Sequence, residues 1–246
     1  MTKSGTENGQ TLRVGVISDF HGDHKREAFD YFLAEAAPDM ILCCGDQQDY
    51  EPYPVPYKFI RGNHEDWEMV ADLSAGRKHV RNLEYLPDGA RLSLAGASVV
   101  GIGGNWSPMG KTAPKYIGPA YLAKMRSVHA DVVLSHETPL HFANDPSHGR
   151  TLEELRELCA VISPRLWFSG HHHYYETERL GRTQIISLGK WPDEWVILEI
   201  DRGDLHWSRW EPADRADYQS RLPKWQRAED VQKRELLALE RRGKRR

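Results

Sequence analysis

The stretch YKFIRGNHED, residues 57–66, decides how the rest of the chain is interpreted. It begins with a short apolar run that is typical of a buried strand, and a Gly-Asn turn follows the strand directly. After the turn an amide, an imidazole and a carboxylate stand in a row, at Asn63, His64 and Glu65. Nitrogen and oxygen donors of this kind bind metal ions or transfer protons. A strand that ends in such residues predicts a site at one edge of a sheet.

Strands and helices alternate over the first two thirds of the chain. We expect strands at 11–18, 39–44, 58–60, 131–135 and 165–169, and helices at 26–37 and 151–161. Alternation of this kind predicts βαβ units with parallel strands. Residues 91–103 predict a hairpin that turns at Ala95-Gly96.

After residue 173 the pattern changes to strands alone. Two further hairpins are expected, one around Gly181 and one around Arg202-Gly203-Asp204. An amphipathic helix is expected over roughly 225–240. The sequence therefore predicts one layered α/β domain over residues 11–218, between a disordered tail at 1–10 and a basic helix and tail at 219–246.

The composition is that of a globular protein, with 39% hydrophobic and 28% charged residues. No apolar run approaches the roughly 18 residues of a membrane span, so no membrane association is expected. The first ten residues lack the apolar region of a secretory signal. Three cysteines, two of them adjacent (Cys43 and Cys44), form no even disulfide framework and fit a reducing compartment. We therefore expect a cytoplasmic protein.

Charge is distributed unevenly along the chain. Residues 219–246 carry ten Lys/Arg and four Asp/Glu, a net charge of +6, which leaves −9 for the first 218 residues of a chain with net charge −3. A basic end on an acidic body predicts contact with RNA or DNA. The alternative is a solvated C-terminal helix with a basic tip.

Five of the expected strands end in residues that bind metals: Asp19 and His21; Asp46; Asn63 and His64; His136; and His171, His172 and His173. Each cluster by itself is common in proteins that bind no metal. In open α/β sheets, however, ligands bind beyond the carboxyl ends of the strands, so we expect the five clusters to converge. Their joint occurrence at strand ends indicates a shared site.

The residue types indicate which metals this site would bind. Carboxylate, imidazole and amide donors suit manganese, iron or zinc, and these positions offer no thiolate for a soft metal. Asp19 and His21 stand two apart on an extended segment, as do His171 and His173, so each pair can face one ion while His172 faces elsewhere. Asp46 follows a glycine that permits close backbone approach, so this carboxylate can bridge two ions.

Together, the motifs Asp-x-His, Gly-Asp-x-x-Asp, Gly-Asn-His-Glu, a lone His and Gly-His-x-His resemble the calcineurin-like metallophosphoesterase family. They span residues 19–173. The resemblance implies a layered β-sandwich of mixed sheets flanked by helices, with the antiparallel hairpins near the C-terminus. It implies one metal ion held by Asp19, His21, Asp46 and His173, and a second held by Asp46, Asn63, His136 and His171. Manganese is the first expectation, with iron, zinc, nickel and cobalt as alternatives.

This resemblance also implies roles for the residues of the opening stretch. Two ions about 3.5–4 Å apart would share Asp46, hold a hydroxide and clamp a phosphoryl group for in-line attack. His64 is expected to act as general acid or to stabilise charge in the transition state, and Glu65 to orient His64 or a ligand imidazole. Arg61 is expected either to contact phosphate or to form a structural ion pair, and Asp49 to support the metal ligands from behind.

Several sequence blocks are similar to those of lariat debranching enzymes, which cleave 2′-5′ phosphodiesters in RNA; among them are ILCCGDQQ, FIRGNHE, VLSHETP and RLWFSGHHH. Many of those enzymes have Cys where this chain has Asp19. The Asp at this position favours a full two-metal site here, and it leaves open that the chain is a relative that acts on another substrate. The protein-phosphatase branch carries an Arg after the second motif, which is absent from GDQQDYEPYP. Residues 105–126 are either a substrate loop, with Trp106, Lys111 and Tyr116 binding bases and phosphates, or an ordinary surface loop.

The predicted function is hydrolysis of a nucleotide or nucleic-acid phosphodiester by a dinuclear metal enzyme, with RNA or DNA as candidate partners. The alternatives are a phosphomonoesterase acting on nucleotides or small molecules, a non-catalytic scaffold of the same fold, and nucleic-acid binding through the basic tail. The sequence predicts no particular oligomeric state.

Overall fold

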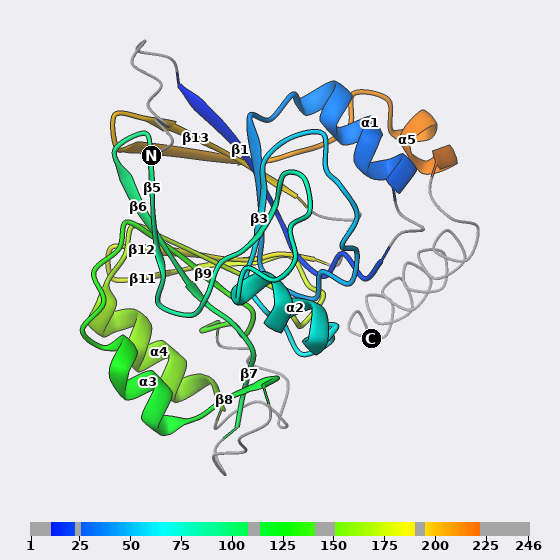
Figure 1. Ribbon diagram of the computed structural model, residues 1–246. Helices are drawn as coiled ribbons and strands as arrows, with labels where there is room; N and C mark the ends of the chain where they lie inside the picture. The colour runs from blue at the N-terminus through cyan, green and yellow to red at the C-terminus, as the bar shows by residue number, and fades with distance from the viewer. Residues whose placement is uncertain (1–10, 23–25, 108–113, 141–150, 190–194, 222–246) are drawn as a thin grey trace, which may run out of the picture.

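Two mixed six-stranded sheets lie face to face at the centre of the computed structural model (Figure 1), which describes residues 11–22, 26–107, 114–140, 151–189 and 195–221. The first sheet has the order β14-β13-β1-β2-β3-β4. It consists of β1 (Leu12–Ile17), β2 (Met40–Cys43), β3 (Tyr57–Phe59), β4 (Leu83–Tyr85), β13 (Val196–Asp201) and β14 (Asp204–Arg209). Strands β1 to β4 run parallel, and β13 pairs antiparallel with β1 and with β14.

The second sheet has the order β11-β12-β10-β9-β6-β5. It consists of β5 (Arg91–Leu94), β6 (Ala97–Ile102), β9 (Val132–Ser135), β10 (Leu166–Ser169), β11 (Glu176–Leu180) and β12 (Thr183–Ser187). Its four inner strands are parallel, and the two edge strands pair antiparallel with their neighbours. A two-stranded sheet of β7 (Asn105–Trp106) and β8 (Tyr116–Ile117) follows β6.

Apolar side chains from both sheets form the core between them, for example Val16 and Leu42 from the first sheet and Val132 and Phe168 from the second. Helices cover the two outer faces (Figure 1). α1 (Arg26–Ala36) and α5 (Arg215–Arg221) pack on the first sheet, and α3 (Pro119–Met125) and α4 (Thr151–Ile162) pack on the second. α2 (Trp67–Ser74) connects β3 to β4. These four layers confirm the expected sandwich of mixed sheets flanked by helices.

Most of the expected elements are confirmed, including the three hairpins. The turn at Ala95-Gly96 has φ values of 45° and 89°, as a tight two-residue turn requires. Residues 105–126 differ from the expected loop, because they contain β7, β8 and α3, whose Leu122 and Met125 are buried. The tail at 1–10 and the helix over 225–240 lie outside the described residues.

Candidate metal centre

The clusters at the strand ends converge in the structure. Asp19, Asp46 and Asn63 follow β1, β2 and β3 of the first sheet, whereas His136 and His171 follow β9 and β10 of the second. The ligand atoms of Asp19, Asp46 and His136 lie within 4.8 Å of one another, and so do those of Asp19, His21 and His173. The expected site thus lies where the two sheets meet at the carboxyl ends of their parallel strands.

The backbone of these strand ends is bent to aim the side chains. Five predicted ligands have left-handed backbone conformations, with φ between 53° and 68°: Asp19, His21, Asp46, His171 and His173. Non-glycine residues rarely adopt this conformation, and such strain concentrates at functional sites. Gly45 has φ of 99°, and a Cβ there would lie 2.7 Å from the His136 ring. The glycine before Asp46 therefore allows the close approach that the sequence predicted.

The first ligand group surrounds Asp19, a carboxylate that is completely buried. His173 Nε2 donates to Asp19 Oδ1 at 3.2 Å, and His21 Nε2 lies 3.8 Å from the same oxygen. Burial alone would raise the pKa of Asp19, but the hydrogen bond from His173 and the charge of His136 outweigh it and hold the pKa well below its ordinary value. Gln48 Oε1 accepts from His21 Nδ1 at 2.9 Å, so His21 Nε2 is the ring nitrogen that lies toward the carboxylates of Asp19 and Asp46.

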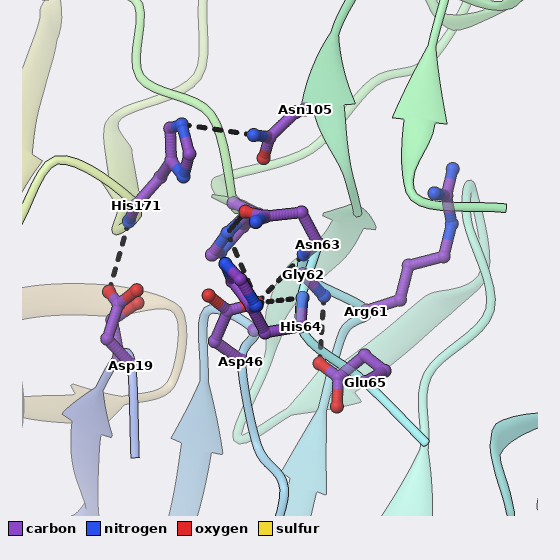
Figure 2. Close-up of polar contacts among 12 residues, drawn as sticks. Asp19, Asp46, Arg61, Gly62, Asn63, His64, Glu65, Asn105 and His171 are labelled. Carbon is purple, nitrogen blue, oxygen red and sulfur yellow. Dashed lines mark hydrogen bonds and ion pairs between the residues drawn. The ribbon is translucent and has the colours of Figure 1, made fainter. Parts of the chain in front are cut away.

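A second group surrounds Asp46, which is also buried. Asp46 Oδ1 accepts from the backbone N–H groups of Asn63 and His64, both at 2.8 Å (Figure 2). His136 Nδ1 must donate to the Cys44 carbonyl at 2.9 Å, since a carbonyl only accepts. His136 Nε2 then faces Asn63 Oδ1 at 2.9 Å and Asp46 Oδ1 at 3.5 Å. A proton or a metal ion can lie between these three atoms.

This donor set fits a cation. Burial lowers the pKa of His136, yet the carboxylates of Asp46 and Asp19 outweigh it and leave the pKa raised. Among the described residues, the ion pairs of these two buried carboxylates involve histidine alone, with no lysine or arginine. Buried carboxylates side by side are costly unless cations compensate them. His21 Nε2 lies 3.7 Å from Asp46 Oδ2, so Asp46 faces both ligand groups.

His171 departs from the expected ligand set. Its ring centroid lies 5.1 Å from that of His136, but its Nε2 accepts from Asn105 Nδ2 at 3.0 Å and its backbone N–H donates to Asp19 (Figure 2). Its ligand atoms group with Glu137 and His172 instead. The pKa of His171 is lowered to about 4, chiefly by burial, so the imidazole is neutral, as a metal ligand must be.

Sequence reasoning did not identify Glu137, the buried residue that follows His136. Its Oε1 accepts from His172 Nε2 at 2.6 Å, which ties the end of β9 to the loop after β10. Burial would raise the pKa of Glu137, but the hydrogen bond and charge of His172 lower it to about 2. The signal in the sequence was the acidic residue beside the lone His together with the middle His of the triplet. His172 thus faces away from the two ligand groups, as its position predicted.

His64 and Glu65 have different surroundings. His64 is exposed at the rim of the site, with its ring centroid 5.8 Å from that of His21. Glu65 is buried and accepts from the backbone N–H groups of Gly62 and Gln47 and from the Tyr50 hydroxyl. Burial raises the pKa of Glu65 to about 7. Because its contacts go to the backbone and to Tyr50, Glu65 shapes the loop and does not orient an imidazole as expected.

The expected substrate residues are only partly supported. Arg61 extends away from Asp46 and His64 (Figure 2) and donates to Asp88 from Nε at 2.9 Å and from Nη2 at 2.7 Å, so the structural ion pair is the correct alternative. Trp106 is only 6% exposed and packs in the core, which excludes it as a stacking surface. Tyr116 is half-buried and lines a cavity of about 500 Å³. Lys111 lies outside the described residues.

Asp49 is likewise engaged elsewhere. This buried carboxylate accepts from Arg26 Nε at 2.6 Å and from Arg26 Nη2 at 2.9 Å. It therefore anchors α1 to the loop after β2. Among the described residues, none of its hydrogen bonds involves a predicted metal ligand.

Comparison with known proteins agrees with this geometry. A family model described as calcineurin-like phosphoesterase matches residues 12–175. A lariat debranching enzyme of Entamoeba histolytica is 22% identical over 74% of this chain and 69% of its own length. A lariat debranching enzyme of Schizosaccharomyces pombe is 24% identical over 66% of this chain, which spans about half (48%) of that relative's length.

Solved structures share the fold at lower sequence identity. A putative 5′-nucleotidase from Staphylococcus aureus superposes with a TM-score of 0.52 at 16% identity, covering 86% of this chain and 57% of that one. The family match covers the strands and the ligand residues of the site. The chain belongs to the calcineurin-like phosphoesterase family, and it is a metal-dependent hydrolase of phosphoric esters.

Proposed function

We propose that this protein hydrolyses a phosphodiester in a nucleotide or nucleic acid. The observation that carries the proposal is the convergence of Asp19, Asp46 and His136 within 4.8 Å, beside an exposed His64. The names of the curated relatives, lariat debranching enzymes, support RNA as the substrate class. In the described part of the chain, no helix is both long and apolar enough to cross a membrane.

We assign the chain's own residues as follows. Asp19, His21 and His173 would hold one divalent ion, and Asp46, Asn63 and His136 would hold another, with His171 beside the second group. When bound, two such ions activate a water molecule and neutralise charge on the phosphoryl group. Manganese is the first candidate, because carboxylate, imidazole and amide donors suit it.

His64 is positioned to supply a proton to the leaving oxygen. Its backbone N–H is fixed by Asp46 Oδ1 at 2.8 Å, and its side chain is exposed at the rim. Glu65 supports the same loop from behind, through the Gly62 N–H at 2.9 Å and the Gln47 N–H at 3.2 Å. Asp46 thus accepts from the His64 backbone, and its contact with Asn63 and that of Glu65 with Gly62 hold the rest of the loop.

A substrate screen tests the proposal. Manganese-loaded enzyme is assayed on branched RNA, linear RNA, DNA, cyclic nucleotides and phosphomonoesters, with Asp46→Asn as the inactive control. We expect diesters to be hydrolysed with the higher kcat/KM, and EDTA to abolish turnover. Hydrolysis of phosphomonoesters alone would contradict the proposal and would support the phosphomonoesterase instead.

A further inference from the structure

A cavity of about 500 Å³ lies beside the loop that carries His64. Its lining includes three aromatic side chains from separate parts of the fold: Trp67 from α2, Tyr85 from β4 and Tyr116 from β8. Arg61 also lines it. Arg61 precedes Asn63 by two residues, and Trp67 follows His64 by three. The loop that carries Asn63 and His64 therefore connects two residues of the cavity lining, Arg61 and Trp67.

Trp67 is not explained by the core. The three hydrophobic clusters formed by the described residues do not include it, although they include Trp106, Trp167 and Trp195. It is half-buried at the first position of α2, and α2 is capped by Asp66, whose side chain accepts from the Met69 N–H. The indole therefore serves neither the core nor the helix cap, and it faces a cavity.

The charge around the cavity argues against a phosphate as its occupant. Asp88 neutralises the Arg61 guanidinium, whose third nitrogen donates to the Pro114 carbonyl. The Arg61 side chain is only 11% exposed, and a guanidinium paired in this way offers little net positive charge to an anion. The aromatic rings remain, and nucleobases stack on aromatic side chains.

We propose that the cavity lined by Trp67, Tyr85 and Tyr116, beside the loop that carries His64, binds a nucleobase of the phosphodiester substrate. This inference rests on the proposed function and adds to it a subsite that selects nucleotide esters over simple alkyl esters. Lys115, which does not line the cavity, places its Nζ over the Tyr116 ring, 5.3 Å from the ring centre. Stacking tolerates all four bases, so we expect weak sequence preference.

The test uses Trp67→Leu, with Trp67→Phe as the variant that keeps a ring. Trp207→Leu, on β14 at the opposite edge of the first sheet, is the matched control for loss of a tryptophan. The substrates are the dinucleotide diester that wild-type enzyme cleaves fastest and analogues in which one base at a time is replaced by hydrogen.

We expect Trp67→Leu to lower kcat/KM on the full dinucleotide about tenfold or more, through KM, because stacking on one side chain contributes this much. On one of the two abasic analogues it should change kcat/KM less than twofold. Trp67→Phe should retain most of the activity and Trp207→Leu all of it. An equal loss on the dinucleotide and on both abasic analogues would overturn the subsite.

A separate measurement distinguishes failure of the subsite from failure of the proposed function. The proposed function is wrong if wild-type enzyme cleaves none of the phosphodiesters in the screen. Should it cleave no dinucleotide, the subsite is decided by adenosine 5′-monophosphate against ribose 5-phosphate, which lacks the base. The subsite is upheld if the nucleotide binds more tightly than the sugar phosphate in calorimetry, or has the lower KM where both are hydrolysed, and if this difference disappears in Trp67→Leu. Equal values for the two compounds overturn it.

Discussion

At the scale of single residues, the proposed function assigns metal binding and proton transfer to neighbouring residues of the loop after β3. Asn63 faces His136 through its side chain, whereas its neighbour His64 exposes its ring at the rim. Both residues donate their backbone N–H to Asp46. One carboxylate therefore fixes a metal-facing amide and a solvent-facing imidazole at the same time.

Replacing His64 with Ala should leave the metal content unchanged and slow turnover. We expect a loss of about 10²–10⁴ in kcat on esters with alkoxide leaving groups, and a much smaller loss on p-nitrophenyl esters, whose leaving group needs no proton. Metal content is measured by atomic emission, with the exposed His79→Ala as control. Equal losses of kcat on the two ester classes would show that His64 is not the general acid.

Glu137 and His172 offer a second test at the residue scale. Their hydrogen bond of 2.6 Å is buried and holds the loop on which His171 and His173 stand. We expect Glu137→Ala to weaken manganese binding about tenfold or more, as outer-shell partners of metal sites do. Calorimetric titration measures the affinity, and Glu137→Gln, which keeps an acceptor oxygen, should recover most of it. Unchanged manganese affinity in Glu137→Ala would show that this hydrogen bond does not support the metal site.

At the scale of the elements, Asp131 joins three strands of the second sheet just before β9. Its carboxylate accepts from the N–H of Ser98 in β6 at 2.8 Å and from the Ser98 hydroxyl at 2.7 Å. Its carbonyl accepts from Arg165 and Leu166 at the start of β10. These contacts set the register of the strands that carry His136 and His171.

We therefore expect Asp131→Asn to destabilise the protein by about 1–2 kcal/mol at neutral pH, since a charged acceptor is lost. Burial raises the pKa of Asp131, but the Ser98 donors and nearby arginines outweigh it, so the folded pKa lies below the unfolded value. The stabilisation is present above the unfolded pKa and is lost as pH falls through the folded one. Urea unfolding at several pH values should show that the difference in free energy of unfolding between variant and wild type decreases in acid. A difference that does not depend on pH would contradict this.

For some elements, the local sequence pattern was sufficient to predict their positions. Alternating apolar residues and turn glycines located the hairpins at Gly96, Gly181 and Gly203 correctly. Helices α2, α3 and α5 were not expected, because each is only seven or eight residues long and buries few apolar side chains. Short helices are decided by packing more than by propensity. The same reason explains Trp106, which packing places in the core although its loop sequence predicts exposure.

At the scale of the whole molecule, the metal centre joins the two sheets. Asp19, Asp46 and Asn63 follow strands of one sheet, and His136 and His173 follow strands of the other. In the proposed function, an ion bound between them adds a link across the sandwich that exists only in the folded state. We therefore expect metal binding and overall stability to be coupled.

Manganese at about 100 times its Kd should stabilise the protein by about 2.7 kcal/mol, which corresponds to a rise in Tm of about 5–10 °C for a chain of this size. Scanning calorimetry with and without EDTA measures the rise. Asp46→Asn should abolish it, whereas Asp72→Asn, which changes a surface carboxylate paired with Arg77, should not. A full rise in Asp46→Asn would show that Asp46 is no ligand.

The sequence by itself determined the layered α/β class, most strand positions and the residues that gather at the strand ends, because apolar periodicity and donor chemistry are local properties of the chain. The sandwich of mixed sheets was implied by the family resemblance alone. Only the tertiary structure decided which donors meet. It pairs Arg61 with Asp88, turns Glu65 toward backbone N–H groups, links Glu137 to His172 and places Trp67 beside Tyr85 and Tyr116. Such pairs join residues distant in sequence or depend on how a loop is packed, and the packing of two sheets sets their distances.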